Sequence, residues 1–300
     1  MAKSSRRTTS RRELARRPGF EQISPEVGEL DERAVDDGMQ RDADATLALM
    51  ADLVGATDRR LANLARRLAA RLLVDIARRG DARRRGIGRM VSLPYAPDVG
   101  DLDIDASLDA IVEAVSGVPD VERLRVRSWA RPATALCLLV DRSGSMGGGP
   151  LATAALAAAA VAIRAPDDYS VVAFGRDVVV VKPQDGVKPV ERVVTDLLAL
   201  RGHGTTDLAG ALRAAALELG RSSASRRVTV LLSDCRSTVD GDPEAIAGAL
   251  DELVVVAPVD DAVEAGSFCR RTGARLVTVS GPSDIPEALG AALDASGVSR

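Results

Sequence analysis

An acidic residue and two hydroxyls stand at alternate positions directly after an apolar run. Residues 133–140 read ATALCLLV and are followed by DRSGSMGGG, which contains Asp141, Ser143 and Ser145. In a turning loop, this spacing can aim three oxygens at one point. One carboxylate and two neutral hydroxyls suit a hard cation such as Mg²⁺, which prefers oxygen ligands and keeps part of its water shell. The sequence therefore predicts a cation-binding loop.

Two further loops offer oxygens that could complete such a site. RGHGTTDLAGAL places Thr205 and Thr206 before an expected helix, and VTVLLSDCRS places Ser233 and Asp234 directly after an apolar strand. In open α/β sheets, ligands bind beyond the carboxyl ends of the strands. Ser, Thr and Asp are also common helix N-caps, but three oxygen-rich loops in this order favour a metal site over caps alone.

The elements expected to position these loops form an α/β pattern. Strand-like apolar runs occupy 133–140, 169–174, 177–181, 228–233, 253–257 and 275–279, and helical stretches occupy 147–164, 188–200, 207–220, 243–252, 260–272 and 284–295. This alternation predicts a Rossmann-like, doubly wound, mainly parallel six-stranded sheet covered on both faces. The short FGRD link at 174–177 predicts a hairpin, and hence one antiparallel strand at a sheet edge.

The charge of the chain changes sign twice before residue 90. Residues 1–20 carry seven basic and one acidic side chain, 21–58 carry two basic and eleven acidic, and 59–89 carry eleven basic and two acidic. The first block has little apolar surface to bury, so we expect residues 1–40 to form a disordered or poorly ordered charged arm. A helical N-terminal region and linker is expected over 41–130, and the α/β domain over 131–297.

Two amphipathic helices are expected in the N-terminal region. Leu47, Met50 and Val54 recur at helical spacing in the acidic block, and the basic block carries an apolar stripe made of Leu61, Leu64, Leu68, Leu72 and Ile76. The basic helix either binds phosphate or a membrane surface, or pairs with the acidic helix just upstream. Opposite charges on adjacent helices favour the pairing. Gly80 and the RRRGIG segment at 83–88 are expected to end the basic helix.

Composition narrows the classes of function. Aromatic residues make up only 2% of the chain and the net charge is -3, so base stacking and general nucleic-acid binding have little to work with. Cys137, Cys235 and Cys269 lack CxxC spacing, which predicts no disulfide framework and a reducing, cytoplasmic setting. No apolar run reaches the roughly 18 residues of a membrane span, and no signal-peptide core is recognisable. A soluble protein is expected.

Known catalytic patterns fit the sequence poorly, so we expect no enzyme. Ser143 occupies a position where a GxSxG elbow needs glycine, and any Ser/His/Asp triad would have to use the single histidine, His203. No GxxxxGK[ST] phosphate loop occurs. The alternatives left open are a magnesium-dependent hydrolase or phosphotransferase that uses Asp141, and a nucleic-acid or membrane adaptor that uses the arginine-rich helix.

The motifs DRSGSM, GTTDLAGAL and LLSD together resemble the metal-ion-dependent adhesion site of von Willebrand factor type A domains. The resemblance covers roughly residues 131–297. It implies an Mg²⁺ site, with Mn²⁺ as the alternative ion, held by Asp141, Ser143, Ser145, Thr206 and Asp234. Hydroxyls would contact the ion and the aspartates would act largely through water. Thr206 is preferred to Thr205 because its distance to Leu212 fits the family pattern. A Glu or Asp carboxylate of a protein partner would fill the open coordination position.

The segment that precedes the Asp141 loop resembles one particular group of this family. The Asp141 loop is preceded by GDLDID, an expected helix and an expected arginine-bearing strand, LRVRSWARP. This order is similar to the CoxE-like bacterial group, whose members accompany MoxR-type AAA+ ATPases and help to assemble or activate other enzymes. The resemblance implies an accessory or adaptor protein of such an ATPase.

Two residues depart from the family pattern or interrupt it. Cys235 stands where the family commonly has glycine, and Arg142 lies between two expected ligands. We expect Arg142 to be a solvated side chain or, like Thr205, a contact to an acidic partner. His203 is expected to be a polar loop residue, with a partner contact as the alternative.

Overall fold

The chain folds into two compact units. The computed structural model describes residues 8–82, 89–95, 101–114, 117, 120–130, 134–142, 148–200 and 204–295. The larger unit is built from residues 1–84, 135–223 and 227–300, and the smaller one from 85–134 and 224–226.

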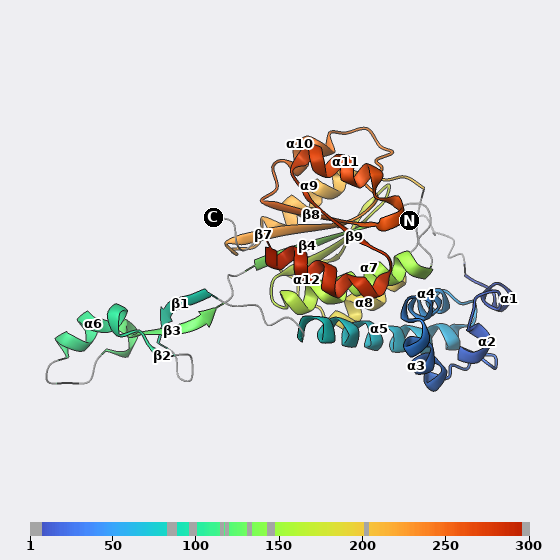
Figure 1. Ribbon diagram of the computed structural model, residues 1–300, viewed down its shortest axis with the longest axis horizontal. Helices are drawn as coiled ribbons and strands as arrows, with labels where there is room; N and C mark the ends of the chain where they lie inside the picture. Colours follow the sequence, from blue (N-terminus) through green and yellow to red (C-terminus); the bar gives the residue numbers. More distant parts are fainter. Residues whose placement is uncertain are drawn as a thin grey trace. The chain divides into compact units, whose positions relative to one another are not determined.

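A six-stranded sheet forms the centre of the larger unit, with the strand order β6-β5-β4-β7-β8-β9 (Figure 1). The strands are β4 (Thr134–Asp141), β5 (Tyr169–Phe174), β6 (Val178–Lys182), β7 (Arg226–Leu232), β8 (Glu252–Pro258) and β9 (Arg275–Val279). β4 and β5, β7 and β8, and β8 and β9 pair in parallel, whereas β5 and β6 pair antiparallel. The predicted mainly parallel sheet with one antiparallel edge strand is therefore confirmed.

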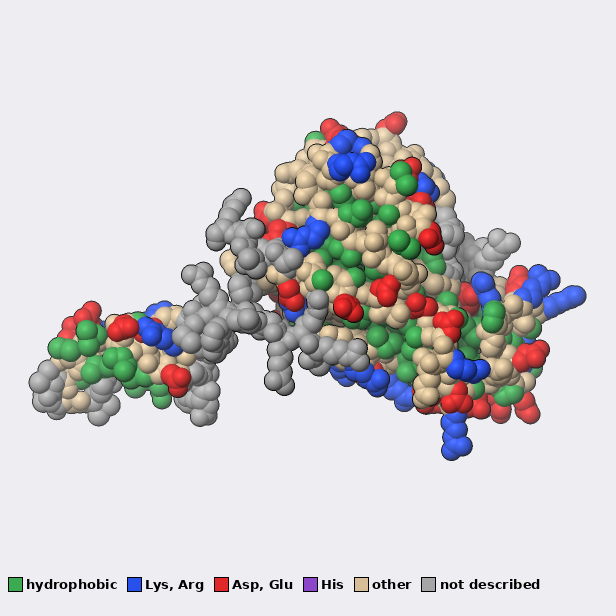
Figure 2. All heavy atoms as spheres, viewed as in Figure 1, with side chains coloured by type: hydrophobic (Ala, Val, Ile, Leu, Met, Phe, Trp, Pro, Cys, Tyr) green, Lys and Arg blue, Asp and Glu red, His purple; other side chains and the backbone are tan. Residues whose placement is uncertain are grey.

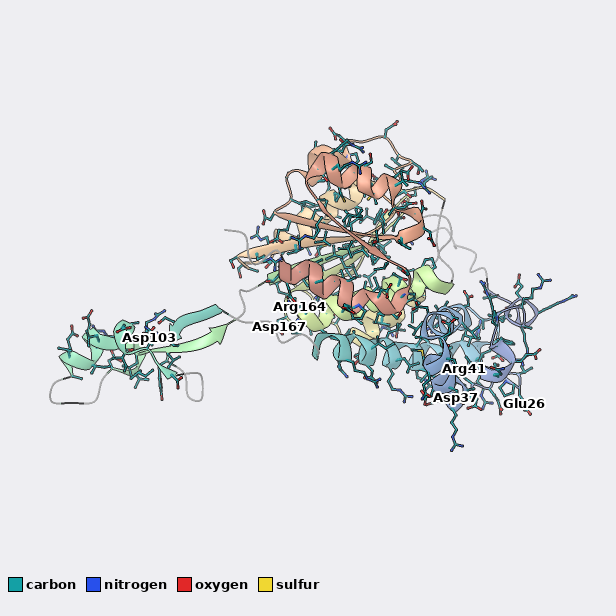
Figure 3. All side chains as sticks on the ribbon, in the orientation of Figure 1. Glu26, Asp37, Arg41, Asp103, Arg164 and Asp167 are labelled. Atoms are coloured by element: carbon teal, nitrogen blue, oxygen red, sulfur yellow. The ribbon has the colours of Figure 1, made fainter. Side chains whose placement is uncertain are left out.

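Helices cover both faces of this sheet (Figure 1). One face carries α9 (Leu208–Leu219), α10 (Pro243–Ala247) and α11 (Val263–Thr272), and the other carries α7 (Gly148–Arg164), α8 (Val190–Leu198) and α12 (Ile285–Ala295). Residues 135–140 of β4 are all buried, because a strand covered on both faces needs apolar side chains in both directions. Arg164, labelled in Figure 3, joins the end of α7 to α12 through an ion pair with Asp294.

Five N-terminal helices form a further layer outside α7 and α8. They are α1 (Arg11–Leu14), α2 (Phe20–Ile23), α3 (Glu32–Arg41), α4 (Ala43–Val54) and α5 (Arg59–Ala82). The predicted apolar positions Leu47, Met50 and Val54 of α4 are buried. They belong to the same continuous hydrophobic core as Leu138 of β4. The N-terminal layer and the sheet therefore share one core.

Residues 11–40 differ from the expected disordered arm. They form α1, α2 and most of α3, with Leu14, Phe20, Ile23 and Val35 buried in the common core. These apolar residues are widely spaced among charged ones, so they create no periodic pattern in the sequence. Tertiary burial stabilises helices that local composition alone would leave unfolded.

The arginine-rich helix α5 faces inward with its apolar side and outward with its charges. Figure 2 shows Lys and Arg side chains along α5. The expected neighbour of α5 is α4, the acidic helix just upstream, and the two helices pack against each other. The ion pair of Arg71, however, is made with Glu32 of α3, at 2.8 Å. Gly80 does not end the helix as expected, because α5 continues to Ala82. A Cβ at Gly80 would lie 2.4 Å from the Pro286 Cβ, so this glycine allows α5 to approach α12 closely.

The smaller unit contains a three-stranded sheet, of which the sequence indicated only the strand within LRVRSWARP. β1 (Arg89–Pro94), β3 (Arg125–Ala130) and β2 (Asp101–Leu102) pair antiparallel in that order, beside η1 (Val121–Arg123) and α6 (Ile104–Glu113). Asp103, labelled in Figure 3, caps α6 by accepting a hydrogen bond from the Ala106 N–H and lies 3.2 Å from Arg127 Nε. The expected linker over this stretch is therefore replaced in part by a folded element. Among the described residues, no helix combines the length and apolar character needed to cross a membrane.

Candidate metal centre

The direction in which the chain crosses the sheet changes between β4 and β7. β4 leads to β5 on one side, and β7 leads to β8 on the other. In open α/β sheets, such a point leaves a crevice beyond the strand ends, where ligands bind. Asp141 ends β4, and Ser233 and Asp234 directly follow β7. Candidate oxygens from two separate strands therefore lie at this crevice.

Ser233 joins the two strand ends. Its Oγ donates a hydrogen bond to Asp141 Oδ2 at 2.7 Å and accepts one from the Cys235 N–H at 2.9 Å. The sequence pattern marked Ser233 as a candidate oxygen but favoured Asp234 as the ligand. The structure shows that Ser233 is the residue of this loop that contacts Asp141, so it orients the carboxylate that ends β4.

Thr206 is held in place by the loop that follows β7. Its N–H donates to Thr238 Oγ1 at 2.7 Å, and its carbonyl accepts from the Thr238 N–H at 3.1 Å and from Ser237 Oγ at 3.3 Å. Thr206 is only 2% exposed, whereas Thr205 is exposed. The two loops that carry Thr206 and Asp234 are therefore tied together by hydrogen bonds that span about thirty residues of sequence.

Asp234 is oriented by a residue that the sequence pattern did not single out. Asp234 Oδ1 accepts a hydrogen bond from the Arg236 N–H at 3.0 Å, and the Arg236 guanidinium lies 3.6 Å from Asp234 Oδ2. The same guanidinium pairs with Asp261 and Glu264. These acidic partners, Glu264 first, raise the pKa of Arg236. Arg236 lies close to Asp234 in sequence, but its other partners are more than twenty residues away and could not be read from local spacing.

A cavity of about 330 Å³ opens beside these strand ends. Asp141, Ser233 and Asp234 contribute oxygens to its wall. Its other walls come from α7, from the ends of β8 and β9 and from η3 (Pro282–Asp284), and they include Pro150, Val256, Val279 and Pro282. Two carboxylates and a hydroxyl around one cavity fit a hard divalent cation, whose preferred ligands are oxygens.

A comparison with models of protein families identifies the type of domain that carries this cavity. Residues 136–237 match the model of the von Willebrand factor type A domain. The matched stretch begins within β4 and ends in the loop after Asp234. This stretch contains Asp141, Thr206 and Asp234 together with the central strands of the doubly wound sheet. The chain contains a von Willebrand factor type A (VWA) domain.

Solved structures with a similar arrangement come from several organisms. Proximal thread matrix protein 1 from the mussel byssus, in a structure described with a zinc occupied MIDAS motif, is 16% identical, with 55% of this chain and 48% of that chain covered and a TM-score of 0.44. A von Willebrand factor type A protein from Catenulispora acidiphila is 14% identical, with 54% and 42% covered and a TM-score of 0.42. BatB from Bacteroides thetaiotaomicron is 12% identical, with 56% and 100% covered and a TM-score of 0.43.

The coverage of these matches differs between the proteins. The chain spans about half of the mussel protein and about two fifths of the Catenulispora protein. No curated protein matches the chain.

Arg142 of the VWA domain is buried, which corrects the expectation of a solvated side chain. It is 7% exposed, its N–H donates to the Phe174 carbonyl at 2.6 Å, and its guanidinium donates to the Asp177 carbonyl at 3.3 Å. Burial lowers the pKa of Arg142, while the charge of Asp177 opposes that shift. Arg142 therefore fastens the end of β4 to the β5–β6 hairpin, because the strand pairing directs it there and away from solvent.

Cys235 of the VWA domain adopts a left-handed backbone conformation. Its φ is +64°, and it is the one non-glycine residue with a positive φ among the described residues. L-residues other than Gly, Asn and Asp rarely adopt this conformation, because Cβ comes too close to the carbonyl oxygen. The cysteine thus keeps the turn that a glycine would adopt freely. Burial raises the pKa of its thiol.

This strain predicts an unusual order of stability at position 235. We expect Cys235→Gly to be more stable than Cys235→Ala by about 1 kcal/mol, because only glycine adopts φ near +64° without steric cost. Both variants lose the same buried sulfur, so the comparison isolates the backbone. Urea unfolding followed by circular dichroism measures the difference.

The matched control for this comparison is Cys269, a buried cysteine within α11. There the order reverses, with Ala about 1 kcal/mol more stable than Gly, because glycine weakens a helix. An alanine variant at position 235 that is as stable as the glycine variant would show that the backbone there is unstrained.

Three of the sequence-predicted residues lie outside the described residues: Ser143, Ser145 and His203. Within the described part of the chain, no group of three or more His, Cys, Asp or Glu side chains is arranged to hold a metal. The predicted ligand set contains only two carboxylates, Asp141 and Asp234, so it does not depend on such a group.

Proposed function

We propose that the VWA domain of this chain binds a divalent cation, Mg²⁺ or alternatively Mn²⁺, and uses it to bind an acidic side chain of a protein partner. The proposed ligands are Asp141, Ser143, Ser145, Thr206 and Asp234. The observation that carries the proposal is the cavity at the crevice between β4 and β7, which Asp141 and Asp234 both line. The hydrogen bond from Ser233 supports it by orienting Asp141.

The chemistry of this site favours binding over catalysis. Mg²⁺ prefers six oxygen ligands, and a set of two carboxylates and three hydroxyls leaves room for water or an outside carboxylate. An ion held in this way attracts a Glu or Asp of another protein, and the interaction then depends on the metal. Arg142 is buried, so we do not propose it as a contact to the partner. The exposed Thr205, together with His203, is proposed for that role.

A MoxR-type AAA+ ATPase, or the enzyme that it helps to assemble, is the partner that we propose. The support comes from the CoxE-like order of GDLDID, a helix and LRVRSWARP before the Asp141 loop. We further propose a cytoplasmic setting, because all three cysteines are free and buried, as suits a reducing compartment.

Calorimetric titration of the full chain with MgCl₂ and MnCl₂ tests the ion site. We expect saturable binding by the wild type and a loss of affinity in Ser143→Ala, which removes one proposed ligand. Ser280→Ala is the matched control, since Ser280 lies on the cavity wall but outside the proposed ligand set. Equal heats for the wild type and Ser143→Ala would overturn the proposed site.

A further inference from the structure

The helix α4 reaches the candidate metal centre from outside the matched VWA segment. Asp52 of α4 accepts a hydrogen bond from the Gly148 N–H at 2.8 Å through its Oδ1. Gly148 is the first residue of α7, the helix that follows the Asp141 loop in sequence. A carboxylate at this place satisfies an unpaired N–H of the first helical turn and interacts favourably with the helix dipole.

Asp52 is held firmly for this contact. The Arg17 Nε lies 2.9 Å from Asp52 Oδ2, and the Asp52 side chain is only 13% exposed. Gly148 has a φ of +45°, and a Cβ there would lie 3.4 Å from Asp52 Oδ2. Gly148 therefore leaves room for α4 to approach the start of α7, and the ion pair with Arg17 orients the Asp52 carboxylate.

A second aspartate of α4 makes an equivalent contact with another segment. Asp44 Oδ1 accepts a hydrogen bond from the Ser283 N–H of η3 at 2.8 Å. A Cβ placed on Gly281 would lie 2.0 Å from Asp44 Oδ2, which is far inside the contact distance of the two atoms. A glycine at position 281 therefore lets the Asp44 carboxylate stay where it lies, whereas a larger residue would force that side chain to move.

The two segments that α4 holds are two walls of the same cavity. Gly149 and Pro150 of α7 line one side, and Gly281 and Pro282 line another. Asp141 and Asp234 line that cavity as well. Both aspartates of α4 therefore act on the immediate surroundings of the candidate metal centre, although α4 lies about ninety residues before Asp141 in the chain.

We propose that α4 positions the metal centre: Asp52 and Asp44 hold the start of α7 and the η3 segment in the arrangement that binds the ion. Asp52 is a positioning residue, because it contacts the start of α7 at Gly148 and is not itself a proposed ligand. A change in the N-terminal helices is thereby transmitted to the metal. This inference rests on the proposed function for its effect on metal affinity, but not for its effect on backbone order.

Two readouts on the full chain test the proposal. Hydrogen exchange in metal-free buffer reports on the backbone amides within the segments 148–150 and 281–284, which are those of Gly148, Gly149, Gly281, Ser283 and Asp284 because the two prolines have none. Calorimetric titration with MgCl₂ reports on affinity. For Asp52→Ala we expect exchange at 148–150 to be faster by about tenfold and the Mg²⁺ affinity to fall by about tenfold, since one buried hydrogen bond is lost. Asp44→Ala should speed exchange at 281–284 instead.

Conservative and distant variants separate positioning from general destabilisation. Asp52→Asn keeps an oxygen acceptor for the Gly148 N–H, so exchange and affinity should return close to the wild-type values. Arg17→Gln removes only the ion pair and should have a smaller effect than Asp52→Ala. Asp37→Ala is the control within the same N-terminal layer, on the outer surface of α3 (Figure 3).

The possible outcomes distinguish the two proposals. Unchanged exchange at 148–150 in Asp52→Ala overturns the role of α4. Faster exchange with unchanged Mg²⁺ affinity also overturns it, because metal binding would then not depend on the contacts that α4 makes. If the wild type binds neither Mg²⁺ nor Mn²⁺, the proposed function fails, and the exchange data alone decide whether α4 orders the cavity walls.

Discussion

Replacement of Asp141 by alanine is expected to abolish metal-dependent partner binding. Asp141 ends the central strand β4 and supplies one of only two carboxylates in the proposed ligand set. Loss of a group that acts on a metal through its first ligands typically weakens metal affinity 10–100-fold, so we expect about 100-fold for Asp141, whose carboxylate would act largely through water. Calorimetric titration with MgCl₂ and a magnesium-dependent pull-down with a purified MoxR-type AAA+ ATPase measure the two effects.

The control for this experiment is Asp240→Ala, which removes an exposed carboxylate from the loop that follows Asp234. It should leave both affinities unchanged. Asp141→Ala also removes the acceptor of the Ser233 hydroxyl, which costs about 1 kcal/mol of stability, so a thermal melt must confirm that the variant is folded. Magnesium affinity within a few-fold of the wild type in a folded Asp141→Ala protein would refute the site. Phosphatase activity that is lost with Asp141 would favour the hydrolase alternative.

Replacement of Leu73 by alanine is expected to destabilise the whole larger unit. Leu73 lies on α5, is 1% exposed and belongs to the same hydrophobic core as Leu138 of β4. Truncation of a buried leucine costs about 2–5 kcal/mol through lost transfer energy and the cavity left behind. Because one core spans both layers, Leu73→Ala and Leu138→Ala should each lower the midpoint of the same cooperative transition.

Urea unfolding followed by circular dichroism and by a probe attached to α5 checks this expectation. The two signals should change together in the wild type and in both variants. Leu217→Ala is the control, because Leu217 is 71% exposed on α9 and its truncation should change the stability by less than about 0.5 kcal/mol. If Leu73→Ala unfolds α5 separately and leaves the sheet intact, the N-terminal layer is an independent unit.

The architecture of the VWA domain could be predicted because its signal is periodic. The apolar strand runs alternate with helical stretches, and the FGRD link correctly indicated β6 as an antiparallel edge strand. Both features follow from local sequence, since strand runs buried on two faces and short hairpin links have characteristic compositions.

The first three helices of the N-terminal layer, α1 to α3, could not be predicted in the same way. Leu14, Phe20 and Val35 are single apolar residues among charges, and their burial depends on partners far along the chain. Gly80 looked like a helix terminator, because its packing against Pro286 depends on a residue about two hundred positions away. Local composition reflects only residues that are close in sequence, whereas the burial of these residues depends on contacts with residues that are distant in sequence.

The sequence motifs propose the residues of the candidate site, but they do not indicate how its loops are connected. The spacing of DRSGS, the position of Thr206 before a helix and the position of Asp234 after a strand follow from the motifs. The hydrogen bonds of Ser233 to Asp141 and of Thr206 to Thr238 join loops that are distant in sequence, and no local pattern encodes them. The burial of Arg142 likewise results from strand pairing.

The alanine-rich helix α7 lies between the sheet and the N-terminal helices, and most of its length is buried. A fragment cut at residue 131, where the family resemblance begins, would bare the side of α7 that α4 and α5 normally shield. Such a fragment would expose an apolar surface to solvent, and we expect it to self-associate. The stretch that a sequence motif delimits is thus shorter than the stretch that must be expressed to obtain a well-behaved protein.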